Sequence, residues 1–146
     1  MRVYLASSWR NDKHNEALSV LRDAGHEVYD YRGDGFSMEW PVDGATYDEM
    51  QAILTDEKAI GHFDMDLDAL DWAEAVVMLM PSGRSAHLEL GYGIGKGKIT
   101  CILWEKDEPD LMHLMCDMIA ENMSTVIEFL NEFTSISREA WLRKRS

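Results

Sequence analysis

Short apolar runs alternate with amphipathic stretches along most of this chain. Three runs are continuous and a fourth alternates apolar with polar positions: residues 3–6, 75–80, 99–104 and 26–31. Such runs are typical of β-strands, and continuous ones are typical of strands that are buried on both faces. Between them, apolar residues recur at helical spacing, as in residues 11–24 before Gly25. The pattern therefore predicts repeated βα units and a parallel sheet.

The rest of the chain extends this prediction. Helical spacing indicates five more helices, and a short apolar run indicates one last strand: helices at 45–58, 61–73, 85–96, 111–120 and after 127, and the strand at 125–127. The last helix ends in the basic residues 143–145. Residues 32–44 contain three glycines and Pro41, which suits a flexible lid. We expect an α/β fold with roughly five parallel strands and helices on both faces.

Composition limits the class of protein and of partner. The 146 residues suffice for a single domain, residues 1–146, that buries about two-thirds of its unfolded surface. A net charge of -13 argues against binding a nucleic-acid polymer, although a small phosphate ligand needs only a local anion site. The two cysteines form no CxxC pair and are expected to be reduced. We find no signal peptide, no apolar run of membrane-spanning length and no metal-ligand spacing, so we expect a cytoplasmic protein without metal or other cofactor.

Residues 82–92 carry the most informative candidate chemistry. They place the carboxylate of Glu89 inside a helix that follows a buried strand, and ligands of open α/β sheets bind at that end of the strands. If Ser85 caps the helix, a capping-box acid would fall at residue 88, so Glu89 misses that structural role. We expect the helix dipole and Arg84 to keep Glu89 ionised, which suits a nucleophile that attacks a sugar carbon. The alternative is an acid that merely stabilises the helix terminus.

The loop at residues 81–85 is a candidate phosphate site. Gly83 would permit close backbone approach, Ser82 and Ser85 offer hydroxyls, and Arg84 offers a guanidinium that matches a phosphate. An ordinary turn with Ser85 as the helix cap is the alternative. The glycine-rich residues 91–97 lie within or at the end of a helix, so they are not a dinucleotide fingerprint, and their small side chains suit tight packing on the sheet.

Asp66 is unusual among the acids of its helix. At 100° per residue, Asp64, Asp68 and Asp71 share one face, whereas Asp66 falls among apolar residues. A carboxylate on a packing face costs several kcal/mol unless it is paired, hydrogen-bonded or protonated. Asp66 is therefore either a structural anchor or a functional residue.

The end of the first strand supplies further candidates. Side chains that follow a parallel strand face the ligand crevice, so Ser7, Trp9 and Arg10 are expected to bind substrate, with Trp9 stacking on a base and Arg10 contacting phosphate or ribose. The alternative places Tyr4 in the core and makes Trp9 a surface anchor.

Together these segments resemble the nucleoside 2-deoxyribosyltransferase superfamily. The resemblance is carried by residues 3–6, by Asp66 eight residues before Glu74-Ala75-Val76-Val77, and by Glu89-Leu90-Gly91-Tyr92 followed by Gly97-Lys98. It is firmest over residues 64–98. The resemblance implies a flavodoxin- or Rossmann-like three-layer sandwich and a glycosyl-enzyme mechanism.

The resemblance also implies roles for individual residues. Glu89 would attack C1′ of the sugar, Asp66 would help the base to leave as an acid or orienting carboxylate, and Tyr4 would hold Glu89 in place. Members of the family complete each pocket with a neighbouring subunit, which implies a homodimer or higher homo-oligomer in which Ser124 or Thr125 reaches across.

One departure from the family pattern bears on the substrate. Transferases that act on free nucleosides usually carry an acid in the loop before the catalytic Glu, whereas this loop is Ser82-Gly83-Arg84-Ser85. The chain is in this respect more similar to the 2′-deoxynucleoside 5′-monophosphate N-glycosidases, so hydrolysis of a nucleotide is the first hypothesis. A base-exchanging deoxyribosyltransferase and a non-catalytic nucleotide-sensing module are the alternatives. The base, and the choice of ribose or deoxyribose, stay open.

Overall fold

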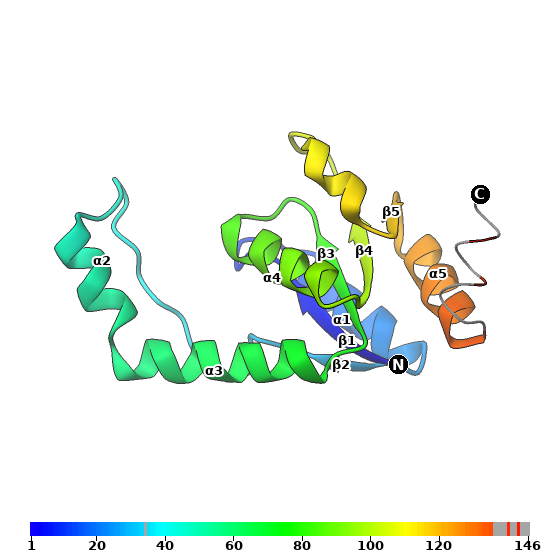
Figure 1. Cartoon of the computed structure of the whole chain (residues 1–146), viewed down its shortest axis with the longest axis horizontal. Helices are drawn as coiled ribbons and strands as arrows, with labels where there is room; N and C mark the ends of the chain where they lie inside the picture. Colours follow the sequence, from blue (N-terminus) through cyan, green and yellow to red (C-terminus); the bar gives the residue numbers. More distant parts are fainter. Residues whose placement is uncertain (34, 136–139, 141–142, 144–146) are drawn as a thin grey trace.

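Five parallel strands form one sheet at the centre of the molecule (Figure 1). The computed structural model describes residues 1–33, 35–135, 140 and 143. In chain order the strands are β1 (Arg2–Ala6), β2 (Glu27–Tyr29), β3 (Ala75–Leu79), β4 (Ile99–Leu103) and β5 (Met118–Ala120). Their spatial order, β2-β1-β3-β4-β5, is that of flavodoxin-like folds, in which the winding direction reverses between β1 and β3. The predicted α/β class is confirmed.

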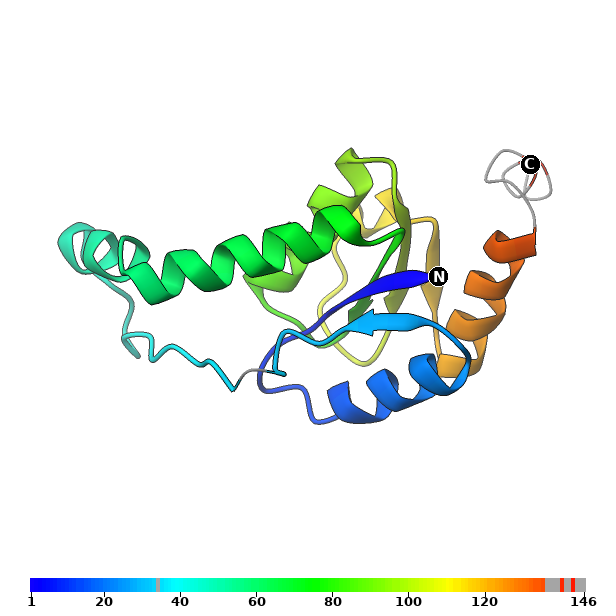
Figure 2. The same ribbon diagram turned by 90° about the horizontal axis from the view of Figure 1, so that it is seen from below.

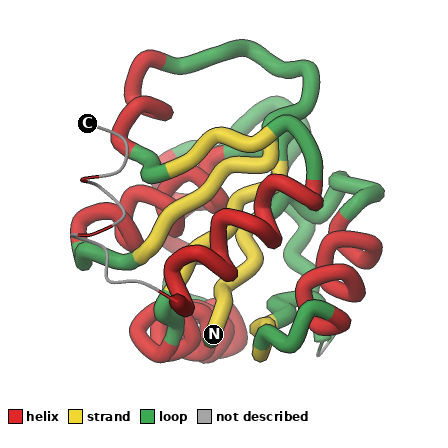
Figure 3. The backbone as a smooth tube through the Cα atoms, turned by 90° about the vertical axis from the view of Figure 1, so that its right-hand side faces the viewer, coloured by secondary structure: helices red, strands yellow, loops and turns green. Residues whose placement is uncertain are grey.

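Helices cover both faces of the sheet, as predicted for a three-layer sandwich (Figures 2 and 3). α1 (His14–Asp23) and α5 (Met123–Ser135) pack with Val3, Leu5 and Val77 on one face. α3 (Glu57–Trp72) and α4 (Arg84–Gly95) pack with Tyr4 and Val76 on the other. Alternate residues of each strand therefore enter different cores, which explains the continuous apolar runs in the sequence.

One glycine of the 91–97 run allows α4 to lie close against the sheet. A Cβ atom built on Gly93 would lie 2.7 Å from Cγ2 of Val76 on β3, closer than carbon atoms can pack. A Cβ atom built on Gly91, Gly95 or Gly97 would lie in open space. Tight packing, as predicted for this run, is thus confirmed for Gly93 and not for the other three glycines.

The prediction for residues 111–127 was wrong. Residues 111–120 do not form one helix: a 3-10 turn (Leu111–Met115) leads into β5 at Met118–Ala120. Asp117 links this segment to β4. Its Oδ2 accepts hydrogen bonds from the backbone N–H of Thr100 (2.9 Å) and from the Thr100 hydroxyl (3.2 Å). Residues 125–127, predicted as the last strand, belong to α5, where Val126 is fully buried.

The remaining boundaries shift by a few residues. α1 begins at His14 rather than at residue 11, and α3 begins after Asp56, whose carboxylate caps it by accepting hydrogen bonds from the N–H groups of Lys58 and Ala59. α2 (Tyr47–Leu54) and the amino-terminal part of α3 extend away from the sheet (Figure 1). Apart from Arg143, the basic end predicted at 143–145 lies outside the described residues. Of the helices the structure describes, none has the length and apolar character needed to cross a membrane.

Candidate active site

The loops that follow β1 and β3 meet at the point where the winding of the sheet reverses. Asn11 joins them: its buried side-chain amide donates to the backbone oxygens of Met80 (3.4 Å) and Pro81 (3.3 Å). Its Oδ1 accepts from the N–H of Lys13 at 3.0 Å, which holds the first loop as it enters α1. Sequence analysis missed Asn11, because a lone asparagine before a helix gives no sign of contacts 70 residues away. The crevice beside these loops is where open α/β sheets bind ligands.

A cavity of about 430 Å³ in this crevice contains most of the predicted site residues. We call it the Glu89 cavity. It is lined by six predicted residues, Ser7, Trp9, Arg10, Asp66, Ser85 and Glu89, together with Tyr31 and part of the 32–44 loop, namely Phe36, Ser37, Met38 and Trp40. Its volume falls within the range of small-molecule sites. The fold thus brings together polar groups from three distant segments and adds aromatic walls that the sequence did not identify.

Burial, rather than the helix terminus, sets the protonation of Glu89. α4 begins at Arg84, so Glu89 lies in the second turn of the helix. Glu89 also borders a smaller hollow of about 210 Å³, whose lining includes the apolar residues Phe63, Leu70 and Leu88. Burial raises the pKa of Glu89 to about 7, and Asp66 adds to the rise. The expectation that Arg84 and the helix dipole keep Glu89 fully ionised is therefore wrong. At neutral pH the carboxyl is divided between its two protonation states.

Tyr4 lies beside Glu89 in the middle of the sheet. Burial and the neighbouring Glu89 both raise the pKa of Tyr4, while the Tyr4 hydroxyl lowers that of Glu89. The Tyr4 hydroxyl and Glu89 Oε2 are buried, and within the described residues neither completes a hydrogen bond of good geometry. Each group nevertheless shifts the pKa of the other, so the two lie within interaction range. Tyr4 is thus positioned to stabilise the Glu89 carboxylate.

Asp66 is joined to the same cluster through Tyr29. The Tyr29 hydroxyl donates to Asp66 Oδ1 at 3.0 Å, and the Tyr29 ring stacks on Tyr4 with centroids 5.4 Å apart. Asp66 raises the pKa of both Glu89 and Tyr4, which places the two carboxyl groups within electrostatic reach of each other. Sequence analysis missed Tyr29, because only the strand pairing Tyr4↔Tyr29 brings it to the site.

The 81–85 loop differs from the predicted phosphate cradle. Gly83, not Ser85, is the N-cap of α4. Because glycine has no side chain, no side-chain hydrogen bond from the N-cap residue caps the helix. The Ser82 hydroxyl donates to the backbone oxygen of Leu79, so its proton is already used. Arg84 is exposed and lines neither the Glu89 cavity nor the smaller hollow beside Glu89. Ser85 alone of this loop lines the Glu89 cavity.

Arg10 is a cation that lines the Glu89 cavity, unlike Arg84. It lines the Glu89 cavity and also an adjoining hollow of about 320 Å³, here called the Arg10 hollow, with Asn11, Ser82, Gly83 and Asp107 among its walls. Uncapped N–H groups at a helix start and one guanidinium favour an anion, whereas Asp107 opposes one. Arg10, which was predicted to contact phosphate or ribose, therefore lies at the cavity, whereas Arg84 does not line it.

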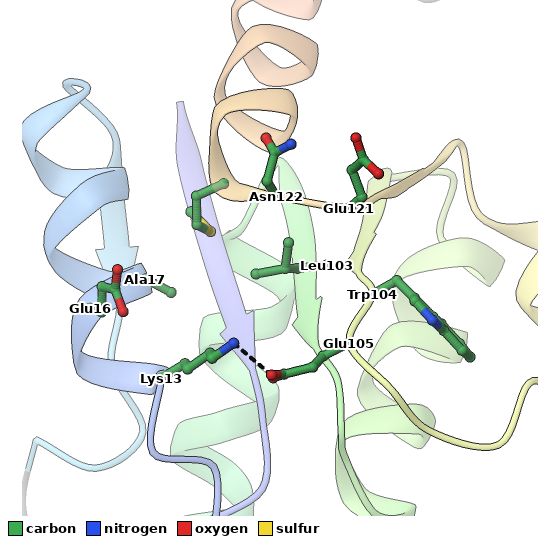
Figure 4. Close-up of a pocket in the computed structure, with 9 residues that line it drawn as sticks. Lys13, Glu16, Ala17, Leu103, Trp104, Glu105, Glu121 and Asn122 are labelled. Atoms are coloured by element: carbon green, nitrogen blue, oxygen red, sulfur yellow. Dashed lines mark hydrogen bonds and ion pairs between the residues drawn. The ribbon is translucent and has the colours of Figure 1, made fainter.

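Ser124 lies apart from this site. It is exposed near the start of α5, and its neighbours Asn122 and Met123 line a different cavity, of about 400 Å³, between α1, β4 and α5 (Figure 4). An ion pair of 2.6 Å between Lys13 Nζ and Glu105 Oε1 spans one side of that cavity. Glu89 and Asp66 do not line it. Ser124 can therefore serve the Glu89 cavity only from a second copy of the chain.

Two enzymes of known structure share this fold. The 2-deoxyribosyltransferase of Bacillus psychrosaccharolyticus matches with a TM-score of 0.63 and 20% identity over 87% of this chain and 90% of its own. The CMP N-glycosidase BcmB of Clostridium botulinum matches with a TM-score of 0.55 and 16% identity over 90% of this chain and 99% of its own. No family model and no curated protein sequence matches the chain. The fold implied by the sequence resemblance is thus confirmed.

Proposed function

We propose that this protein is an enzyme that hydrolyses the N-glycosidic bond of a nucleoside 5′-monophosphate, with Glu89 as the nucleophile. The observation that carries the proposal is the buried Glu89 carboxyl, which faces a ligand-sized cavity together with a second carboxyl, Asp66. Paired carboxyl groups are the usual machinery for cleaving a glycosidic bond. The names of the two fold neighbours, a deoxyribosyltransferase and a CMP N-glycosidase, support the same class of chemistry.

The proposed reaction has two steps. In the first, a carboxylate oxygen of Glu89 attacks C1′, the bond from C1′ to the base breaks, and its electron pair leaves on the base nitrogen, which takes a proton from Asp66. In the second, water attacks C1′ of the glycosyl ester and gives a proton to Asp66, which restores both carboxyl groups and releases the sugar phosphate. Tyr4 stabilises the Glu89 carboxylate before attack and after release.

Preference for a 5′-phosphate rests on the Arg10 hollow. The Arg10 guanidinium and the uncapped start of α4 both favour an anion in this hollow. Arg10 also borders the Glu89 cavity. A nucleotide could therefore place its phosphate in the hollow and its sugar near Glu89. Trp9 and the aromatic residues of the 36–40 segment offer stacking surfaces for the base.

Release of free base tests the proposal directly. The purified protein is incubated with nucleoside 5′-monophosphates and the matching free nucleosides, and products are separated by chromatography. We expect base from monophosphates, and a loss of roughly a hundredfold or more in Glu89→Gln. Glu128→Gln, the same change at an exposed helical position, is the matched control and should keep full activity. Full activity in Glu89→Gln would refute the assignment of the nucleophile.

Base exchange is the second candidate, because the deoxyribosyltransferase is the more similar of the two neighbours described above. Transfer and hydrolysis share the first step and differ in whether a second base or water attacks the ester. Adding adenine or cytosine to the reaction separates them, since transfer produces a new nucleoside or nucleotide. Binding of nucleotides with no release under either condition would instead favour a sensing module.

We also propose that the protein forms a homo-oligomer. Phe63 and Leu88, at the rim of the hollow beside Glu89, are 61% and 75% exposed. α2, which extends from the sheet, has no buried residue. A second copy that packs against this face would cover apolar surface and bring new groups to the site. Light scattering after size-exclusion chromatography measures the mass, and a monomer at micromolar concentration would contradict the proposal.

A further inference from the structure

The Ser7 hydroxyl, at the end of β1, belongs to a line of three polar side chains. Ser7 Oγ lies 2.7 Å from Nδ1 of His14, and Nε2 of His14 lies 2.9 Å from Oδ1 of Asp30. Ser7 is 7% exposed and His14 is fully buried, yet Ser7 lines the Glu89 cavity. This line of hydrogen bonds therefore runs from the partly exposed Asp30 through the buried His14 to the wall of the Glu89 cavity.

The direction of each hydrogen bond follows from Asp30. Asp30 Oδ1 also accepts from the backbone N–H of Arg32 at 3.0 Å, so it acts as an acceptor and His14 Nε2 must donate to it. Burial lowers the pKa of His14, and although Asp30 acts to raise it, the net direction, with the charge of Arg32, is downward, which favours the neutral ring. A neutral ring protonated on Nε2 carries a lone pair on Nδ1. The Ser7 hydroxyl must then donate its proton to His14.

Tyr31 does not reverse this direction. Its hydroxyl donates to the backbone oxygen of Ser7 at 2.8 Å, while its oxygen lies 3.3 Å from Nε of Arg32, a donor. The Tyr31 proton is thus used on the backbone, and at 3.1 Å its oxygen competes poorly with the 2.7 Å contact to His14. The lone pairs of Ser7 Oγ are left for other partners.

We infer that Ser7 is a specificity-determining acceptor, held in that role by His14 and Asp30, and that it recognises a hydrogen-bond donor of the ligand. The nature of the ligand rests on the proposed function: in a nucleotide the donor is a sugar hydroxyl or an amino group of the base. Phosphate oxygens are acceptors, so Ser7 does not bind the phosphate. His14 is a positioning residue, since it acts only through Ser7.

The tautomer of His14 tests the inference without any ligand. Long-range proton–nitrogen NMR spectra of ¹⁵N-labelled protein at pH 8 distinguish the two neutral rings of histidine. We expect protonation on Nε2 and a bare Nδ1. Protonation on Nδ1 would make Ser7 an acceptor from His14 and a donor toward the cavity, which would overturn the inference whatever the substrate is.

Binding of matched nucleotides tests the role of Ser7. Calorimetry in the Glu89→Gln background, which suppresses turnover, compares CMP with 2′-deoxy-CMP, 3′-deoxy-CMP and UMP, which lack the 2′-hydroxyl, the 3′-hydroxyl and the base amino group of CMP, respectively. We expect one of the three to bind about 3- to 10-fold more weakly than CMP. That difference should vanish when Ser7→Ala is added and persist with Ser37→Ala, a serine of the same cavity.

The possible results separate the two proposals. The analogue that loses affinity tells whether the donor is the 2′-hydroxyl, the 3′-hydroxyl or the base amino group. Differences that are unchanged by Ser7→Ala would overturn the role of Ser7 while leaving the proposed function intact. Failure of these four nucleotides, and of AMP and GMP in the same assay, to bind would overturn the proposed function and, with it, the ligand group assigned to Ser7.

Discussion

Replacing Glu89 with glutamine should stabilise the protein at alkaline pH even though it removes the proposed nucleophile. The folded protein buries the Glu89 carboxyl, and burial disfavours its charged form. Glutamine has nearly the same shape and carries no charge. The variant is therefore free of a cost that the native protein bears whenever Glu89 is ionised.

The pKa gives the size of this cost. It rises from an ordinary value of 4.5 to about 7 on folding. Each tenfold change in acidity corresponds to about 1.4 kcal/mol, so the ionised Glu89 destabilises the folded state by at most about 3 kcal/mol. Entry of water into the open cavity reduces that figure, and we expect a gain in the free energy of unfolding of about 1 to 3 kcal/mol. For a domain of this length the gain corresponds to roughly 3–10 °C in Tm.

The pH dependence distinguishes this effect from other causes. Below pH 4.5 the carboxyl is protonated in both the folded and unfolded states, and it contributes no difference. As pH rises from 4.5 through about 7, the unfolded state loses its proton first, so the native protein loses stability relative to Glu89→Gln. Above about pH 7 the advantage of the variant should be complete and constant.

Thermal unfolding of both proteins at pH 5, 6, 7 and 8, followed by circular dichroism, measures this dependence. Glu128→Gln, at an exposed position of α5, controls for the general effect of removing one negative charge from an acidic protein. An equal change in Tm for the two variants at pH 8 would refute the reasoning. So would a Glu89→Gln advantage that is the same at pH 5 and pH 8.

Three further changes test other parts of the structure. Tyr4→Phe removes the hydroxyl that lowers the pKa of Glu89, so the pH profile of kcat/KM should shift toward higher pH. We expect several-fold less activity than the native protein at pH 6.5 and recovery at pH 8.5. An unshifted profile would contradict this role of Tyr4. Gly93→Ala should lower the free energy of unfolding by about 1 to 3 kcal/mol in urea titrations, because the added Cβ meets Val76 of β3. Gly91→Ala in the same helix has open space for the added Cβ, so it should raise the free energy of unfolding by up to about 1 kcal/mol. Asn11→Ala removes the link between the two loops and should cost about 1 to 3 kcal/mol by the same assay, with a rise in KM; unchanged values would show that the loops hold their places unaided.

Long buried strands were the most predictable part of the fold. β3 and β4 receive apolar neighbours on both faces, so every residue of β3 is buried and the run is continuous in the sequence. β5 could not be found in this way. It is three residues long at the edge of the sheet, and Ile119 is 43% exposed, so no periodic pattern marks it. Its pairing with β4, and the adjoining hydrogen bond between Asp117 and Thr100, join residues 17 apart in the sequence.

The candidate site was predictable to the extent that it follows strand ends and helix faces. The rule that ligands bind at the carboxyl ends of strands placed Ser7 and Arg10 with the loop before α4, and the helical period placed Asp66 on the packing face of α3. Tyr29 reaches the site through strand register, and Asn11 through contacts between loops. Neither relation has a local signal in the sequence.

The order of strands and helices up to β4, and the residue types available at the crevice, follow from the sequence alone, because periodicity and side-chain chemistry are local properties. The state of those residues depends on the tertiary fold. It placed Arg10 rather than Arg84 beside the cavity, raised the pKa of Glu89, and brought Ser7, His14 and Asp30 into one line of hydrogen bonds. Burial and hydrogen-bond geometry sum contributions from segments that are distant in the chain, so protonation and polarity are properties of the folded molecule.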